Sequence, residues 1–186
     1  MYVTGKDKSA IHPDLRAAIF GISVRYGTAA EFSALKQEWQ TTTSVDGKDI
    51  ALRALARLQT PDLLSEYLTV LFNDVATQDI HVGAIGLAAN SKTRHGLWLY
   101  IKNNFDDIRS RLGENMVVLD RFLQLSLKLF VDRETEKDIA QFFEGKDNSG
   151  YDRGLAIVSD TILERAAYKE RDAAIILEWL KENGHA

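Results

Sequence analysis

The sequence predicts an all-α protein, and three observations support this. Proline occurs only twice and glycine 12 times in 186 residues, so few residues interrupt a helix. Nearly every segment repeats its apolar residues at the spacing of one helix face. No segment sustains an alternation of apolar and polar residues, and no hairpin turn lies between β-rich runs.

The first pair of helices is expected over about residues 14–40. Gly27 is expected to stop the first helix, because glycine adopts a positive φ without strain. Thr28 and Glu31 then form the capping box of the second helix. The apolar stripes expected to be buried are Leu15, Ala18, Ile19 and Ile22 on the first helix, and Phe32, Leu35 and Trp39 on the second.

The middle of the chain predicts four more helices. Asp46 is expected to cap a helix over residues 48–59, which buries Ala51, Ala54, Leu55 and Leu58. Thr60-Pro61 starts the next, because a proline in the first turn costs no hydrogen bond. A helix of small residues over about 81–89 precedes a longer one over 97–112, which is expected to kink and which Gly113 stops.

The C-terminal third predicts a central helix followed by three others. Residues 115–131 are apolar on most sides, so neighbours are expected to cover this helix on more than one face. Asp132 is expected to cap the next helix. After a loop over residues 146–150, two final helices are expected, with apolar stripes over 155–162 and 173–180.

The expected helix pairs begin near residues 14, 47, 80, 114 and 151, about 33 to 37 residues apart. A nearly constant step is typical of an α-solenoid, in which each pair covers the apolar face of its neighbour. We therefore expect a single helical-repeat domain over residues 1–186, built from about five antiparallel helix pairs in a right-handed curved stack of the HEAT or armadillo kind. An irregular helical bundle is the alternative.

The composition argues against several classes of protein. Lys and Arg total 23 against 27 Asp and Glu, and a net charge of −4 argues against a nucleic-acid partner. The absence of cysteine excludes disulfides and thiolate chemistry and fits a reducing compartment. The N-terminus has no apolar signal region, and no window approaches about 18 uninterrupted apolar residues, so we expect no membrane partner and a cytoplasmic location.

The sequence offers no recognisable catalytic constellation. None of its four histidines, which are His12, His81, His95 and His185, belongs to an H-E-x-x-H pattern. Gly21-Ile22-Ser23 resembles only half of a nucleophile elbow, because the second glycine is missing and no strand precedes it. We therefore expect neither catalytic nor metal-binding residues in this chain.

Three arginines are the candidates for ligand contact. Arg53 and Arg57 lie one turn apart, opposite the apolar stripe of their helix, so they should project away from the core. Arg94 begins the helix that carries Trp98 and can face the same space. On a concave surface, a guanidinium can hold a carboxylate through two parallel hydrogen bonds. The alternative is that all three are ordinary solvated arginines.

Several short segments, in order along almost the whole chain, carry a likeness to a known family. They are His12-Pro13-Asp14-Leu15-Arg16, Tyr26-Gly27 with Phe32 and Leu35, Ala54-Leu55-Ala56-Arg57, Gln78-Asp79, Trp98 with Asn104, Phe142-Phe143-Glu144, and Arg171-Asp172 through Trp179-Leu180. Together they resemble the C-terminal helical domain of the gluzincin-type zinc aminopeptidases. The likeness is closest to the puromycin-sensitive and fungal cytosolic branch rather than to the endoplasmic-reticulum enzymes.

The resemblance implies a role for this chain within a larger enzyme. Family members are about four to five times longer, and their zinc and H-E-x-x-H motif belong to an upstream catalytic domain, so this chain would hold no cofactor. The helical domain encloses the substrate chamber and contacts the distal ends of peptide substrates. Arg57 corresponds to an arginine that meets the peptide's carboxy end in some relatives, and Arg94 to an arginine of the puromycin-sensitive branch. The second arginine of the reticulum enzymes corresponds to about Ala89.

Two functions therefore compete. The first is a non-catalytic C-terminal domain of a zinc aminopeptidase, whose partners are the upstream catalytic domain of the same polypeptide and peptide substrates. The alternative is an independent α-solenoid scaffold that binds a peptide or a protein on its concave face. A third idea, a small all-α hydrolase, has no supporting residues.

Overall fold

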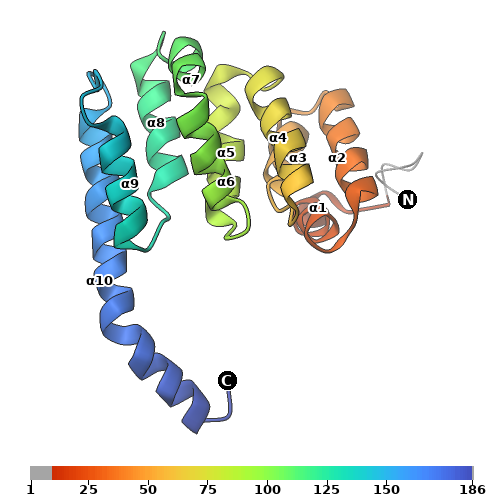
Figure 1. Ribbon diagram of the computed structural model, residues 1–186. Coiled ribbons are helices and arrows are strands. Elements are labelled where there is room, and N and C mark those ends of the chain that lie inside the picture. Colours follow the sequence, from red (N-terminus) through yellow and green to blue (C-terminus); the bar gives the residue numbers. More distant parts are fainter. Residues whose placement is uncertain (1–9, 186) are drawn as a thin grey trace. The chain divides into compact units, whose positions relative to one another are not determined.

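A computed structural model describes residues 10–185, and all regular structure in that range is helical (Figure 1). The prediction of an all-α, solenoid-like protein is confirmed. In chain order the elements are η1 (Pro13–Leu15), α1 (Arg16–Tyr26), α2 (Ala29–Thr41), α3 (Val45–Leu55), α4 (Pro61–Asn73), η2 (Thr77–Asp79), α5 (Ile80–Ala89), α6 (Arg94–Asn103), α7 (Phe105–Leu112), α8 (Met116–Leu127), α9 (Arg133–Phe143) and α10 (Asp152–Glu182).

The helices form two compact units, one that ends at Glu114 and one that begins at Asn115. The first unit contains α1 to α7 and the second contains α8 to α10. The expectation of a single domain over residues 1–186 stays a prediction, as does a right-handed curvature of the whole stack. Within the range that the structure describes, no helix is long and apolar enough to cross a membrane.

Helix α3 is the centre of the first unit. It packs against α1, α2 and α5, and its side chains Ala51 and Leu55 are fully buried. From α4, the Tyr67 hydroxyl donates a hydrogen bond to the carbonyl oxygen of Leu52 at 2.7 Å, and its ring meets that of Phe32 edge-on. Burial raises the pKa of Tyr67, so this hydroxyl remains a neutral donor. These contacts of Tyr67 join α4 to α3 and α2 within the first unit.

The capping box at the start of α2 is confirmed. The backbone N–H of Thr28 donates to Oε2 of Glu31 at 2.7 Å, and the N–H of Ala30 donates to Oγ1 of Thr28 at 3.2 Å. The bond from the Thr28 N–H is the main reason why the pKa of Glu31 is lowered. Gly27 follows the first helix as expected, but the expected positive φ is wrong, because its φ is −87°. A Cβ at Gly27 would lie 2.2 Å from the carbonyl oxygen of Ser23, so lack of space is what requires glycine there.

The predicted buried face of α1 is wrong. Leu15 and Ile22 are more than half exposed, at 54% and 55% of their surface. The buried residues of α1 are Phe20 and Gly21, which are adjacent, and Val24, which follows about one turn later; they lie on another face.

Two helix boundaries also differ from the prediction. Ser44, not Asp46, caps α3, because its Oγ accepts the N–H of Gly47 at 3.1 Å, and α3 ends at Leu55 before the predicted end. The helix expected over residues 97–112 is divided into α6 and α7. The division falls at Asn104, whose backbone N–H and side-chain amide both donate to the carbonyl oxygen of Tyr100, at 3.0 Å and 2.8 Å.

In the second unit, α8 buries one face rather than most of its circumference. Leu119, Phe122 and Leu127 are fully buried, but Val117 in the first turn is 68% exposed. The expectation that neighbours cover α8 on more than one face is therefore wrong for its first turn. The predicted cap of α9 is confirmed, since the N–H of Thr135 donates to Oδ1 of Asp132 at 2.8 Å.

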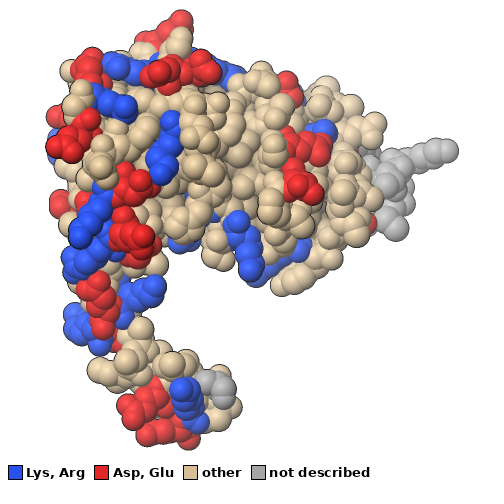
Figure 2. Space-filling view, viewed as in Figure 1, with Lys and Arg blue, Asp and Glu red and all other residues tan. Residues whose placement is uncertain are grey.

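The two final helices that we expected are one continuous helix of 31 residues, α10. No glycine or proline lies between Gly154 and Asn183, so nothing in the sequence interrupts it. Only its first half buries an apolar face, whereas the second stripe, over residues 173–180, is largely exposed. Charged side chains of both signs are interspersed along the lower part of α10 (Figure 2).

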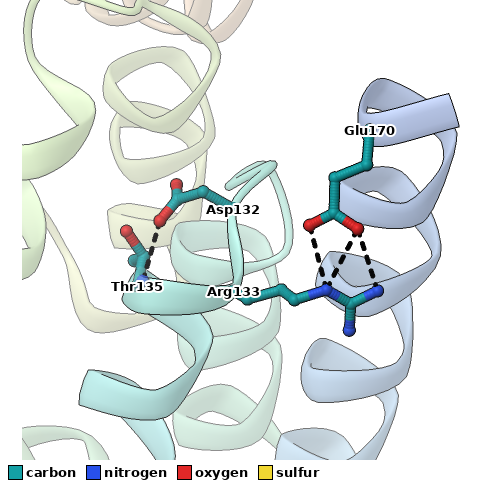
Figure 3. Close-up of polar contacts among 4 residues, drawn as sticks. All are labelled: Asp132, Arg133, Thr135 and Glu170. Carbon is teal, nitrogen blue, oxygen red and sulfur yellow. Dashed lines mark hydrogen bonds and ion pairs between the residues drawn. The ribbon is translucent and has the colours of Figure 1, made fainter. Parts of the chain in front are cut away.

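An ion pair joins α9 to the middle of α10. Nε and Nη2 of Arg133 donate to the two carboxylate oxygens of Glu170 at 3.0–3.2 Å (Figure 3). The same bonds raise the pKa of Arg133. Both side chains are about half exposed, so the pair contributes little to the stability of the fold.

Candidate functional site

The strongest candidate site is a groove of about 610 Å³ in the first unit, which we call the cationic groove. It is lined by the end of α1, by α3 and the turn after it, and by α5 and the turn after it. The lining residues are Arg25, Arg53, Arg57, Gln59, Val82, Ile85, Gly86, Ala89, Asn90, Ser91 and Lys92. Figure 2 shows basic side chains gathered on the lower edge of this unit, between the turn after α5 and helix α1.

The charges of the cationic groove are one-sided. Four of its lining residues are cations, and among the residues that the structure describes no carboxylate lines it. Nε of Arg53 donates to Oδ2 of Asp49 at 2.7 Å, which compensates one of the four charges. The guanidinium of Arg25 lies 5.4 Å from the ring centre of Tyr26. Three cations, on Arg25, Arg57 and Lys92, thus remain available to an anionic ligand.

Arg57 is exposed, as expected, although it lies after the end of α3 rather than on it. Its side chain passes along α1 at Gly21, where a Cβ would lie 2.9 Å from both Cδ and Nε of Arg57. The backbone beneath it is held by two hydrogen bonds. Its own N–H donates to the carbonyl oxygen of Ala54 at 3.0 Å, and the Gln59 amide donates to its carbonyl oxygen at 2.8 Å.

Asn90 and Gly86 fix the turn that carries Arg57 to α5. The side-chain amide of Asn90 donates to the carbonyl oxygens of Ala56 and Leu58, at 3.3 Å and 2.7 Å. A Cβ at Gly86 would lie only 2.5 Å from Cβ of Ala56, so the two segments are in close contact. The sequence indicated Asn90 only as the end of a helix, and no local signal reveals its bonds to a turn more than 30 residues away. The backbone that carries the groove is therefore fixed by contacts between the turn after α3 and the end of α5.

Arg94 is placed differently from Arg57. It is half-buried, its Nε donates to the carbonyl oxygen of Ala88 at 2.5 Å, and it does not line the cationic groove. This bond satisfies a carbonyl in the last turn of α5. Ala89, by contrast, lines the groove together with Arg57. A ligand contact by Arg94 stays a prediction.

Other parts of the chain offer weaker candidates. In the second unit, α9 and α10 line a groove of about 710 Å³, but its charges include both Lys137 and the carboxylates of Glu136 and Glu144. Ser159 donates to Glu136 there at 2.5 Å, so that polar group is already engaged. Over residues 10–185, no three His, Asp or Glu side chains lie close enough together to hold a metal ion. The cationic groove therefore differs from the groove between α9 and α10 in that all its charged lining residues carry the same sign.

Comparison with known proteins gives a consistent result. A family model described as ERAP1-like C-terminal domain matches residues 1–164. Aminopeptidase 2 of Candida albicans is 35% identical over 179 residues, which are 95% of this chain and 19% of that protein. Aminopeptidase 2, mitochondrial, of Saccharomyces cerevisiae is 31% identical over 185 residues, which are 99% of this chain and 19% of that protein. Aminopeptidase N of Rattus norvegicus is 20% identical over 187 residues, which cover 98% of this chain and 19% of that protein. The chain thus spans about a fifth of the length of these relatives.

Proposed function

Because the chain belongs to the ERAP1-like C-terminal domain family, we propose that it is the non-catalytic C-terminal domain of a zinc-dependent aminopeptidase. In this role it encloses the chamber in which peptides lose their N-terminal residues and contacts the distal end of each peptide. Two findings support the proposal: the similar proteins named aminopeptidases are about five times longer than this chain, and the cationic groove has the charge that a peptide carboxylate needs.

The cationic groove is the observation that carries the peptide contact. Arg57 presents a planar guanidinium, which can bind a carboxylate through two parallel hydrogen bonds. Its path is bounded by Gly21 on α1, and its backbone is held by Ala54 and Gln59. Because the backbone at Arg57 is already held, this turn does not have to be ordered when a peptide binds, so more of the interaction energy is available for affinity. We propose Arg57 as the principal contact for the carboxy end of a peptide.

The chemistry of peptide hydrolysis is assigned to another part of the parent protein. In the described range, no group of three metal-binding side chains fits a zinc ion. In the family it resembles, an upstream catalytic domain would hold the zinc, which would supply Lewis-acid chemistry for hydrolysis there. That domain is the proposed partner within the same polypeptide. We also propose a cytoplasmic location.

The domain's contribution is enclosure and positioning. A wall that excludes bulky substrates, and that moves as a rigid body when the chamber opens and closes, changes access without changing the chemical step. Contact with the distal end of a peptide would add binding energy far from the reacting bond, which holds that bond in place. The effect is expected only for substrates long enough to reach the groove.

The proposal is tested by the variant Arg57→Ala in the parent enzyme, assayed with a longer peptide and with a single-residue chromogenic substrate. We expect kcat/KM to fall for the peptide and to be nearly unchanged for the small substrate. Equal losses on both substrates would mean that Arg57 acts on folding or positioning and would contradict the proposed contact. The coding sequence upstream of this chain decides against the independent scaffold if it contains H-E-x-x-H.

A further inference from the structure

The cationic groove holds more positive charge than one carboxylate neutralises. Arg25, Arg57 and Lys92 have no carboxylate partner among the described residues, whereas Arg53 is engaged by Asp49. A bound carboxylate that takes two hydrogen bonds from one guanidinium would leave the other two cations uncompensated. Unpaired like charges around a groove favour a ligand that carries more than one negative charge.

The three cations come from three separate segments of the chain. Arg25 lies in the last turn of α1, Arg57 in the turn after α3, and Lys92 in the turn after α5. The turns after α3 and α5 are joined by the side chain of Asn90. The charges are therefore distributed around the groove by the fold, rather than clustered by sequence on one helix face.

The remaining lining indicates which kind of anion fits. Val82, Ile85 and Ala89 provide apolar surface beside the cations. A volume of about 610 Å³ is in the range of sites that take a peptide-sized ligand rather than a single small ion. Mixed apolar and cationic lining suits a peptide segment better than a phosphate-rich polymer, which presents little apolar surface.

We propose that the cationic groove selects peptides that carry an acidic side chain beside their carboxy-terminal carboxylate. This inference rests on the proposed function, because it assumes a peptide ligand. Arg57 holds the terminal carboxylate, and Arg25 and Lys92 provide the field that attracts the second negative charge. The preference concerns the distal end of the peptide, far from the bond that the parent enzyme cuts.

The test measures binding of labelled short peptides to the 186-residue chain by fluorescence anisotropy. Two peptides differ only in the residue before the carboxy end, Asp in one and Asn in the other, and both keep a free carboxylate. We expect the Asp peptide to bind about twofold to fivefold more tightly at low salt, which is the range of partly exposed ion pairs. The advantage should shrink as the salt concentration rises, because screening weakens these contacts.

Variants locate the effect. Lys92→Gln and Arg25→Gln should each reduce the ratio of the two affinities while the Asn peptide still binds. Lys181→Gln, which removes an exposed lysine of α10 outside the groove, should leave the ratio unchanged. A melting curve of each variant confirms that it is folded.

The outcomes separate this inference from the proposed function. Equal affinities for the Asp and Asn peptides, or a ratio that Lys92→Gln and Arg25→Gln both leave unchanged, would overturn the selection of acidic tails. Either result would leave the groove as a binder of peptide carboxylates. Failure of both peptides to bind would overturn the inference and the proposed peptide contact together.

Discussion

The side chain of Arg57 occupies the space that a β-carbon would fill at Gly21. A Cβ built at Gly21 would lie 2.9 Å from both Cδ and Nε of Arg57 and 3.0 Å from its Cζ. Gly21 is a buried residue in the interior of α1, whereas Arg57 follows α3. The arginine proposed to meet the peptide is thus positioned by a glycine on a different helix.

This relationship predicts the effect of Gly21→Ala. Alanine favours a helix over glycine by about 0.5–1 kcal/mol, and the three atoms nearest to the new methyl group all belong to the flexible side chain of Arg57. The melting temperature should therefore be unchanged or slightly higher, while affinity for a peptide carboxylate falls because Arg57 is displaced. Calorimetry and peptide titration check the two effects separately. Unchanged affinity would mean that the path of Arg57 does not matter for binding.

Gly86→Ala is the matched contrast, with the opposite expectation for stability. A Cβ there would lie 2.5 Å from Cβ of Ala56, a fully buried residue that cannot move aside as an arginine side chain can. Overpacking of this kind destabilises by about 1–3 kcal/mol. Urea denaturation of the two glycine variants should show a loss for Gly86→Ala and none for Gly21→Ala. Equal stabilities would contradict the close contact between α5 and the turn after α3.

Phe122→Ala tests the core of the second unit. Phe122 is fully buried on α8, so its truncation should cost about 3–5 kcal/mol through the loss of apolar contacts and the cavity that remains. Val117→Ala on the same helix is the control, because a side chain that is 68% exposed should contribute no more than about 0.5 kcal/mol. Thermal melting of both variants provides the comparison. A small loss for Phe122→Ala would show that α8 is not packed as described.

The capping box predicts a pH dependence. Hydrogen bonds from Thr28 lower the pKa of Glu31 in the folded state, so its contribution to stability is complete above the pKa of the unfolded chain. That contribution is lost as the pH falls through the lower folded-state value, because the carboxylate must then bind a proton. Melting temperatures of the natural chain and of Glu31→Gln should differ at neutral pH and converge in acid. A difference that does not depend on pH would rule out the charged capping contact.

Local signals in the sequence predicted most helix starts and stops. Thr28 with Glu31, Thr60-Pro61 and Asp132 mark helix starts because side chains within a few residues decide them. The continuity of α10 was missed because two apolar stripes were interpreted as two helices. No helix-ending residue lies between the two stripes, and a shift of the apolar stripe from one side of a helix to another does not by itself end the helix.

The sequence alone does not predict which face of α1 is buried or how the cationic groove is shaped, and the reason is physical. Both depend on contacts between residues far apart in the chain, such as Gly21 with Arg57, or Asn90 with the carbonyl oxygens of Ala56 and Leu58. Periodicity indicates that Arg57 avoids the core, but it does not indicate which helix its side chain passes. The roles of Arg57 and Arg94 remain predictions that binding experiments must decide.

The most direct test of the central claim is a titration of the 186-residue chain with one short peptide in two forms, with a free carboxy end and with an amidated one. We expect the free form to bind more tightly, Arg57→Gln to abolish the difference, and Lys181→Gln, a variant of an exposed lysine outside the cationic groove, to retain it. Equal binding of the two forms to the natural chain would contradict the claim that this domain holds the carboxy end of a peptide.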